Sequence, residues 1–365
     1  MKKVAIIMAG GSGERFWPLS RKQNPKQLLK LFSHKTMLEE AIDRIASVVD
    51  RKDIFIISNA LLKNSISKEL PDFPEENIIA EPSKMNTAPC LALGLSLLLS
   101  RYSLPAHEII AGVFTADHFI RPLHKFSDDI QTAYECAGNH PYLVTLGIPP
   151  IRPETGYGYI ESGSPIEAHS PVLSVVSFRE KPDINTALSF ISAGTFFWNS
   201  GMFFYRLDTF SDAMHNSMPI TFEFMNKITE HLCTETGDIH DEITASFFNN
   251  MEATSIDYGV LEKISNVAVL PASFLWDDVG SWDALARLGD SNHNNSIEHG
   301  NIISIDTKES ILWNEHPEIL LTSVGTENMT IILTKDALLV CPIEQAQQVK
   351  QIVQQLKNND FDHLL

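Results

Sequence analysis

Short apolar runs alternate with longer segments of helical pattern over the first 150 residues, and this alternation limits the fold more than any other feature. The apolar runs lie at residues 4–8, 54–57, 109–114 and 142–146. Nearly every position in them is apolar, as in parallel strands that helices cover on both faces. Such alternation predicts βαβ units with right-handed crossovers. We therefore expect an α/β fold with a doubly wound, mixed but mostly parallel sheet that binds ligands beyond the carboxyl ends of its strands.

Helices are expected between these strands, at residues 36–49, 88–100 and 123–139. The first begins with Thr36 and Glu39, which have the spacing of a capping box. The mixed pattern continues to about residue 290.

After a polar break at residues 290–295, short strands recur about every ten residues without helices between them, and an amphipathic helix follows at 343–357. This change predicts two domains, at residues 1–290 and 296–365, the second a small β-domain or solenoid that ends in a helix.

Charge and composition exclude several classes of protein. Lys and Arg number 28 against 46 Asp and Glu, a net charge of −18, so general nucleic-acid binding is not expected. The four cysteines have neither metal-ligand spacing nor the density of a disulfide framework. No apolar run reaches the roughly 20 residues that span a bilayer, and the run at residues 4–9 is too short for a signal peptide. We expect a cytoplasmic protein without nucleic-acid or membrane partners.

A glycine-rich loop directly follows the first strand. Gly10, Gly11 and Gly13 allow positive φ and a close approach of the backbone, so several N–H groups can form an anion cradle. The loop has neither the Walker pattern nor the dinucleotide fingerprint. Arg15 within the loop and Lys26 beyond it supply a planar fork and a point charge, as a triphosphate requires.

The segment AGGSGERFWPLSR, followed by PKQ at residues 25–27, closely resembles the signature of the sugar-nucleotide pyrophosphorylases. Its Phe-Trp-Pro-Leu-Ser part is similar to that of the bacterial mannose-1-phosphate guanylyltransferases. Seven further blocks follow in the order of that family: EP with NTAP at 81–89, TADH at 115–118, GYGY at 156–159, FREKP at 178–182, WNSGMF at 198–203, SIDY at 255–258 and WDDVGSW at 276–282.

This resemblance implies a Rossmann-like, GT-A-like nucleotidyltransferase domain over residues 1–290. It also implies a short left-handed β-helix-like domain at 296–365 that serves dimerisation or braces the active site, and a homodimer is expected. The implied reaction is single displacement at the α-phosphorus, with Mg²⁺: GTP and α-D-mannose 1-phosphate give GDP-mannose and pyrophosphate. Transfer of this kind depends on orienting the reactants and neutralising charge.

Three sets of residues carry the implied roles. The catalytic set is Arg15, Lys26, Asp117 and Asp278, of which Asp117 and Asp278 hold the metal, with Asp277 as the competing carboxylate. The nucleotide set is Gly10, Gly11, Ser12, Gly13, Glu14, Arg15, Lys26, Glu81, Asn86 and Thr87. Which of Glu81, Asn86 and Thr87 reads the base stays open. The sugar-phosphate set is Gly156, Tyr157, Gly158, Glu180, Lys181, Asn199, Gly201 and Asp257.

Other functions compete with this one. A transferase for glucose 1-phosphate, or one using UTP or dTTP, more usually reads RL-x-P-x-T where this loop reads RFWPLS. A non-catalytic sugar-nucleotide sensor on the same fold could lose its charged residues, whereas Arg15, Lys26 and Lys181 are present here with both candidate metal ligands. A dehydrogenase would need the missing dinucleotide fingerprint. Isomerase activity is not expected, because only a helix follows residue 343.

Overall fold

The computed structural model describes residues 1–359 and 361–365, which form two compact units. Unit 1 comprises Met1–Gly10, Ile42–Thr115 and Ile120–Trp276, and unit 2 comprises Gly11–Ala41, Ala116–Phe119 and Asp277–Leu365. These units do not coincide with the predicted linear division near residue 290. The reason lies in the hydrophobic core of unit 2, where Phe16, Trp17 and Phe119 pack with Trp282 and Trp313. The phosphate loop thus shares its core with the C-terminal part of the chain.

A nine-stranded sheet forms the centre of unit 1. Its strands are β1 (Lys2–Met8), β2 (Ile54–Asn59), β3 (Ile78–Glu81), β4 (Ile109–Thr115), β6 (Leu143–Ile148), β7 (Tyr159–Pro165), β8 (Leu173–Arg179), β9 (Phe196–Arg206) and β10 (Val267–Pro271). They are arranged in the order β3-β2-β1-β4-β9-β6-β10-β8-β7. The pairings set β9 and β8 against the direction of the other seven strands, so the predicted mixed, mostly parallel sheet is confirmed. The short strands β5 (Phe119–Arg121) and β11 (Leu275–Asp277) pair with each other.

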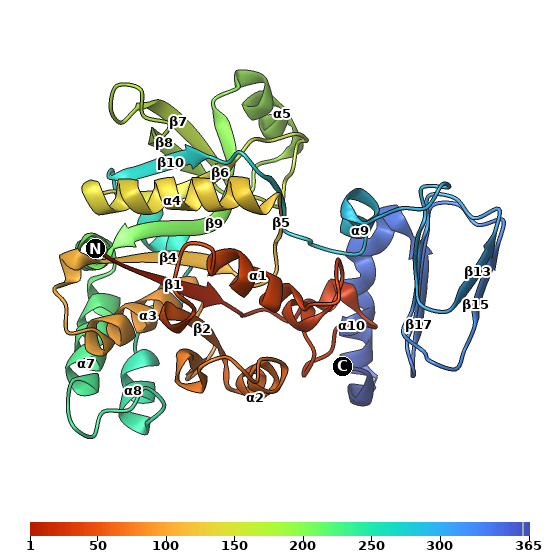
Figure 1. Cartoon of the computed structure of the whole chain (residues 1–365), viewed down its shortest axis with the longest axis horizontal. Coiled ribbons are helices and arrows are strands. Elements are labelled where there is room, and N and C mark those ends of the chain that lie inside the picture. Colours follow the sequence, from red (N-terminus) through yellow and green to blue (C-terminus); the bar gives the residue numbers. More distant parts are fainter. Residues whose placement is uncertain (360) are drawn as a thin grey trace. The chain divides into compact units, whose positions relative to one another are not determined.

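Helices cover both faces of this sheet (Figure 1). The helices that precede residue 250 are α1 (Met37–Ile45), α2 (Ala60–Glu69), α3 (Thr87–Arg101), α4 (Leu123–Asn139), α5 (Ile184–Ala193), α6 (Leu207–Ser217), α7 (Pro219–Leu232) and α8 (Glu242–Phe248). On one face Tyr134 and Phe126 of α4 pack on the aromatic rings of Phe114 and Phe204. On the other face α3 and α7 join a second apolar cluster with β1 and β4.

The predicted capping box is present at the start of α1. The backbone N–H of Glu39 donates to Thr36 Oγ1 at 3.1 Å, and the N–H of Thr36 donates to Glu39 Oε2 at 2.7 Å. Two N–H groups that the helix itself leaves unpaired are thus satisfied.

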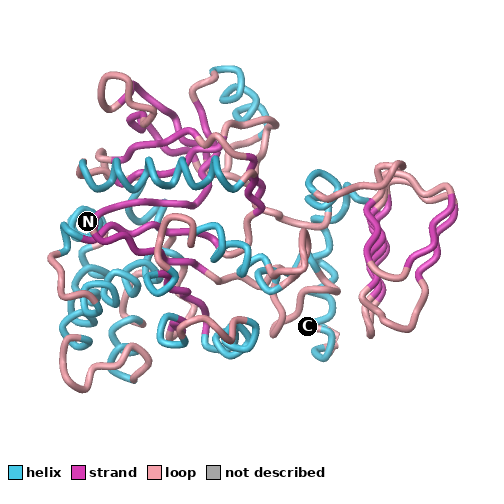
Figure 2. Tube along the Cα trace, viewed as in Figure 1, coloured by secondary structure: helices cyan, strands magenta, loops and turns pink. Residues whose placement is uncertain are grey.

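The described residues of the C-terminal part of the chain form further strands and helices. The strands are β12 (Ile297–His299), β13 (Ile302–Ile305), β14 (Ile311–Asn314), β15 (Leu321–Val324), β16 (Met329–Leu333) and β17 (Leu338–Pro342), and the helices are α9 (Asp283–Leu288) and α10 (Val349–Asn358). Parallel strands stack here as successive turns of a β-helix-like coil, as Figure 2 shows. The predicted β-domain is confirmed, and β17 closes it by pairing antiparallel with β16. Among the residues described, no helix is long and apolar enough to cross a membrane.

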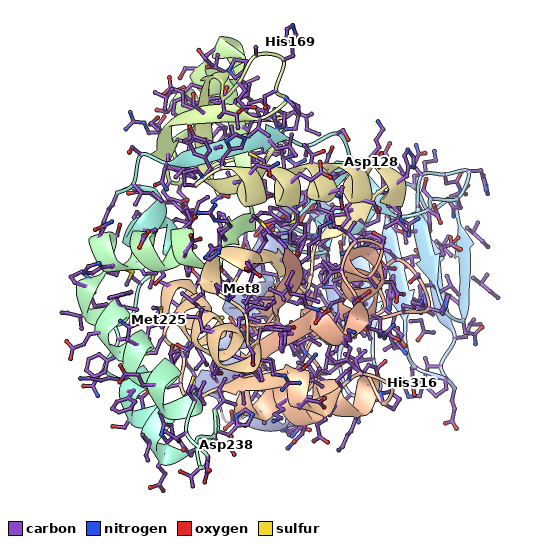
Figure 3. The ribbon with its side chains drawn as sticks, turned by 60° about the vertical axis from the view of Figure 1, so that its left-hand side comes forward. Met8, Asp128, His169, Met225, Asp238 and His316 are labelled. Carbon is purple, nitrogen blue, oxygen red and sulfur yellow. The ribbon has the colours of Figure 1, made fainter. Side chains whose placement is uncertain are left out.

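Strand ends determine where the motif residues lie. Met8, labelled in Figure 3, ends β1 and leads into the glycine-rich loop. Thr115 ends the neighbouring parallel strand β4 and leads to Asp117. Both segments therefore leave the sheet at the same edge, where α/β folds bind ligands.

Candidate active site

Backbone conformation fixes the glycine-rich loop. Gly11 and Gly13 have φ of +100° and +59°, values that favour glycine. A Cβ on Gly13 would lie 2.4 Å from Lys26 Cβ, so no larger residue fits there without displacing Lys26. The carbonyl of Gly13 accepts from the N–H of Phe16 at 2.9 Å and from Ser20 Oγ at 2.8 Å. The loop is thereby held as one rigid turn against Lys26.

Unit 2 contains a cavity of about 370 Å³ beside this loop. The predicted residues Ser12, Gly13, Glu14, Arg15, Lys26, Asp117 and Asp278 all line it, together with His118, Gly280 and Lys350. Segments of the chain that are far apart in sequence therefore meet around one polar space. Backbone amides, cations and carboxylates are all available there to a polyphosphate and its counterion.

Lys26 is the buried centre of this arrangement. Its ammonium lies 2.9 Å from Asp117 Oδ2 and donates to the carbonyl oxygen of Asp278 at 2.5 Å. Burial alone would raise the pKa of Asp117, but the charges of Lys26 and His118 outweigh it, and the pKa lies below its ordinary value. Asp117 is therefore a carboxylate at neutral pH, as a metal ligand must be.

Arg15 carries an unsatisfied donor. Its Nε is buried and has no hydrogen-bond partner within the described part of the chain. A buried donor without a partner costs stability, about 1–3 kcal/mol, unless another group accepts its proton. An anion in the adjoining cavity would supply that acceptor.

The two neighbouring aspartates of the WDDVGSW block differ in their surroundings. Asp277 is 3% exposed, accepts from the N–H of Val279 at 2.8 Å and pairs with Arg287 at 3.0 Å. Asp278 lines the cavity, and Asp277 does not. This difference favours Asp278 over Asp277 as the metal ligand.

The donor set of the cavity suits a hard cation with few protein ligands. Throughout residues 1–359 and 361–365, no three His, Cys, Asp or Glu side chains cluster as a metal cage. A divalent ion held by Asp117 and Asp278 would take its remaining ligands from water and phosphate oxygens. Mg²⁺ is bound in this way at phosphate-transfer sites, so the residues fit it.

The candidate base-binding residues lie in unit 1, at the end of β3 and the start of α3. Thr87 Oγ1 accepts from the N–H of Ile256 at 2.8 Å, which joins this segment to the SIDY block. Asn86 has φ of +73° and accepts from the N–H of Thr87 at 2.9 Å. Burial raises the pKa of Glu81, and the thiol of Cys90 donates to its carboxylate. All three residues thus have hydrogen-bond partners within unit 1, and Glu81 is the one carboxylate among them.

Most of the candidate sugar residues form one cluster in unit 1. Asn199 is at its centre, because its Nδ2 donates to Asp257 Oδ1 at 2.8 Å and its Oδ1 accepts from the N–H of Gly201 at 3.1 Å. The backbone N–H of Asn199 donates to the carbonyl of Gly158 at 2.8 Å. A Cβ on Gly158 would lie 2.3 Å from Glu180 Oε1, so a larger residue there would displace the carboxylate of Glu180.

Tyr157 packs edge-on against Trp198 and Trp276, with ring centroids 5.2 Å and 5.5 Å away. Gly156 lies in open space, since a Cβ there would meet nothing within 4 Å. The structure therefore brings six members of the predicted set together: Gly158, Glu180, Lys181, Asn199, Gly201 and Asp257. Tyr157 lies next to this cluster through Trp198, which precedes Asn199.

Two carboxylates of the sugar cluster titrate above their ordinary range. Burial raises the pKa of Glu180, and the nearby charge of Asp257 raises it further. Burial also raises the pKa of Asp257, although the hydrogen bond from Asn199 and the charge of Lys181 oppose that effect. Lys181 therefore provides positive charge beside two partly buried acids.

Backbone strain coincides with three of the predicted motifs. Asn86, Lys181 and Val279 have φ of +73°, +45° and +50°. The first two are candidate site residues, and Val279 directly follows Asp278. Positive φ is uncommon outside glycine and is a true outlier for a β-branched residue such as Val279. Such strain concentrates at functional sites, where it holds side chains in a required direction.

Sequence reasoning missed Gly280 and Lys350 at the cavity, and it missed Arg287, which fixes Asp277. Gly280 lies within the quoted WDDVGSW block, so the motif could have identified it. Nothing in the sequence around Lys350 signals a binding role.

Comparison with known families supports the resemblance on which the site residues were assigned. The nucleotidyl transferase family model matches residues 4–294, and the model of the mannose-phosphate isomerase/GMP-like β-helix domain matches residues 300–356. The chain is 34% identical over 362 residues to mannose-1-phosphate guanylyltransferase RfbM of Salmonella typhimurium, covering 99% of this chain and 74% of that protein.

Solved structures agree. A Thermus thermophilus protein described as a mannose-1-phosphate geranyltransferase is 30% identical, with a TM-score of 0.85 over 98% of this chain and 100% of that one. A Helicobacter pylori protein described as a mannose-6-phosphate isomerase is 25% identical, with a TM-score of 0.60 over 76% of this chain and 100% of that one. On the extent of these matches, the chain belongs to the nucleotidyl transferases, and within them to the family of the bacterial mannose-1-phosphate guanylyltransferases.

Proposed function

We propose that this enzyme transfers a guanylyl group from GTP to α-D-mannose 1-phosphate, producing GDP-mannose and pyrophosphate. Family membership supports the class of reaction. The observation that carries the proposal is the buried, unpaired Nε of Arg15, in a residue that lines the cavity of the glycine-rich loop. A triphosphate is the anion that such a loop, with two cations, is built to hold.

In this reaction a phosphate oxygen of the sugar phosphate attacks the α-phosphorus of GTP. The bond from the α-phosphorus to the oxygen bridging to the β-phosphate breaks, and that oxygen leaves with pyrophosphate. One phosphoanhydride replaces another, so the reaction is reversible. Arg15 and the loop N–H groups hold the triphosphate and stabilise the charge that develops on the leaving group. Lys26 keeps Asp117 ionised and adds positive charge beneath the phosphates.

Asp117 and Asp278 would hold Mg²⁺ in the cavity of unit 2. The bound ion would supply positive charge to phosphate oxygens and keep them aligned for displacement. The assignment to these two carboxylates is supported by the lowered pKa of Asp117 and by the engagement of Asp277 with Arg287.

The sugar cluster of unit 1 would bind mannose 1-phosphate. Lys181 would pair with the phosphate, and the carboxylates of Glu180 and Asp257 would accept hydrogen bonds from hexose hydroxyls. Asn199 would position Asp257 through the bond that already joins them. Gly158 and Gly201 would leave room for the sugar beside the backbone, with Tyr157 as one wall.

Glu81 is the proposed guanine reader. A carboxylate can accept from both N1–H and the exocyclic amine of guanine, a pair of donors that adenine does not offer in that pattern. Thr87 and Asn86 would fix the position of the segment that carries it, since each is already bonded to the backbone. The glycines at positions 10 and 11 would lie along the base and ribose.

The test is pyrophosphate release from each of GTP, ATP, UTP and dTTP, paired with mannose, glucose and other hexose 1-phosphates. We expect the highest kcat/KM for GTP with mannose 1-phosphate. A preference for glucose 1-phosphate with UTP or dTTP would reassign the enzyme within its family. Absence of release from every pair, with nucleotide sugar still bound, would identify a sensor. A homodimer, a left-handed β-helix and a cytoplasmic location remain predictions.

A further inference from the structure

Helix α10 contributes a cation to the cavity beside the glycine-rich loop. This cation belongs to none of the motifs. Lys350, its second residue, lines the cavity together with Arg15 and Lys26. The sequence separates Lys350 from these residues by more than 300 positions, yet all three belong to unit 2.

Apolar packing fixes the position of this helix. Val349 and Val353 are buried in the same hydrophobic cluster as Phe16 and Trp17, which lie in and just after the short 3₁₀ helix Glu14–Phe16. That short helix carries Arg15. The apolar face of α10 therefore packs on the segment that presents the main candidate for phosphate binding.

Two polar contacts hold α10 along the cavity. Before the helix, Gln347 Nε2 donates to Ser281 Oγ at 2.8 Å, three residues after Asp278. Near its end, the Lys357 ammonium lies 2.7 Å from Glu14 Oε1. Lys350 and Lys357 are seven residues apart, so both lie on one face of the helix. Lys350 is therefore held between two anchored points.

The cations of this region differ in their partners. Lys26 is bound to Asp117, and Lys357 is bound to Glu14. Among the residues that the structure describes, none forms a hydrogen bond or ion pair with the ammonium of Lys350. An exposed ammonium on a polar cavity is thus available to a ligand.

We propose that Lys350 binds the terminal phosphates of the nucleoside triphosphate and the pyrophosphate that leaves. This inference rests on the proposed function, because it takes the cavity of the glycine-rich loop as the triphosphate site. The bridging oxygen gains negative charge as its bond to the α-phosphorus breaks, and a nearby ammonium stabilises that charge. The C-terminal helix then has a direct role in nucleotide binding, in addition to packing.

Calorimetric titration with inorganic pyrophosphate in the presence of MgCl₂ tests this without turnover. We expect the Kd of Lys350→Ala to rise about tenfold, which corresponds to about 1.4 kcal/mol. Lys350→Arg should recover most of the affinity, because it restores the charge. Lys308→Ala removes the same charge from an exposed residue that does not line the cavity, and its Kd should equal that of the wild type.

Turnover provides a second readout. Lys350→Ala should raise the KM for GTP about tenfold and leave the KM for mannose 1-phosphate unchanged. Lys350→Gln, which keeps helix propensity and length, replaces the alanine variant if that variant does not fold. Equal pyrophosphate Kd values for wild type and the folded variant, or an equal loss in Lys308→Ala, would overturn the inference. A shifted Kd in an enzyme that transfers no guanylyl group would instead refute the proposed function and leave the Lys350 site standing.

Discussion

Asp277 is buried and forms an ion pair with the more exposed Arg287, whose Nη2 lies 3.0 Å and whose Nε lies 3.3 Å from Asp277 Oδ2. The pairing raises the pKa of Arg287 through the charge of Asp277, against the lowering effect of burial. Of the two adjacent aspartates, Asp277 therefore has a structural role in the pair with Arg287, and Asp278 lines the cavity.

Asp278→Asn should weaken metal dependence while leaving the fold intact. We expect the Mg²⁺ concentration that gives half-maximal activity to rise at least about tenfold, because one of two protein ligands loses its charge. The measurement is initial rate against MgCl₂ concentration at saturating GTP and mannose 1-phosphate.

Asp277→Asn is the matched control, since it removes the same charge one residue earlier. It should lower the free energy of unfolding by about 1–3 kcal/mol, because Arg287 loses its buried partner. The half-maximal Mg²⁺ concentration should stay near that of the wild type. A metal titration shifted in Asp277→Asn and unchanged in Asp278→Asn would contradict our assignment.

Arg15→Ala should lower kcat by about 10²–10³ without loss of stability, since a preorganised donor to the developing charge is worth that much. The unpaired Nε disappears with the side chain, so the free energy of unfolding should stay constant or rise. Stopped-time assays of pyrophosphate release and thermal unfolding measure the two effects. Arg15→Lys keeps the charge but not the planar guanidinium, so its kcat should lie between those of Arg15→Ala and the wild type. A kcat near normal in Arg15→Ala would remove Arg15 from catalysis.

Local pattern was sufficient to predict much of the fold. Helix α4 occupies the predicted range 123–139, and the first four predicted strands correspond to β1, β2, β4 and β6. Their apolar runs reflect burial on both faces of the sheet, which is a property of the residues themselves. The division into compact units could not be predicted this way, because the packing of Phe16 and Trp17 with Trp282 depends on contacts distant in sequence.

The candidate site was predictable where a motif carries it and not elsewhere. Arg15, Lys26, Asp117 and Asp278 meet at one cavity as the motifs imply. The resemblance already favoured Asp278 over Asp277, but the physical reason could not be predicted, because it rests on Arg287, ten residues away on a helix. Lys350 could not be found from its own neighbours, because an exposed lysine on an amphipathic helix is usually only a solvated side chain.

Lys181→Ala should raise the KM for mannose 1-phosphate far more than the KM for GTP. The side chain is the cation placed beside Glu180 and Asp257, and its removal leaves the sugar phosphate facing two acids. We expect an increase of at least about tenfold, as for loss of a charge-assisted contact of about 1.5–3 kcal/mol. The positive φ of Lys181 means that Lys181→Gly would relieve strain, so the glycine variant separates the side-chain effect from the backbone effect. If the KM for GTP rises as much as the KM for mannose 1-phosphate in both variants, Lys181 does not belong to the sugar-phosphate site.

Lowering the pH should weaken the binding of the hexose. The loss should begin at a higher pH than it would for carboxylates with ordinary pKa values. Burial, followed by repulsion from Asp257, raises the pKa of Glu180, and burial raises that of Asp257. Each group therefore takes up its proton above the usual range of about 3.9–4.3, and a protonated carboxyl accepts hexose hydroxyls poorly. The Kd of GDP-mannose should rise as the pH falls toward that range. GDP-mannose is the right probe, because its diphosphate is esterified at both ends and lacks the ionisation near pH 6 that mannose 1-phosphate has. Asp257→Asn keeps an acceptor for the hydrogen bond from Asn199 and removes the repulsion between Asp257 and Glu180. The rise in the Kd of GDP-mannose should therefore begin at a lower pH in this variant. If the rise begins at the same pH as in the wild type, Glu180 and Asp257 do not govern the binding of the sugar.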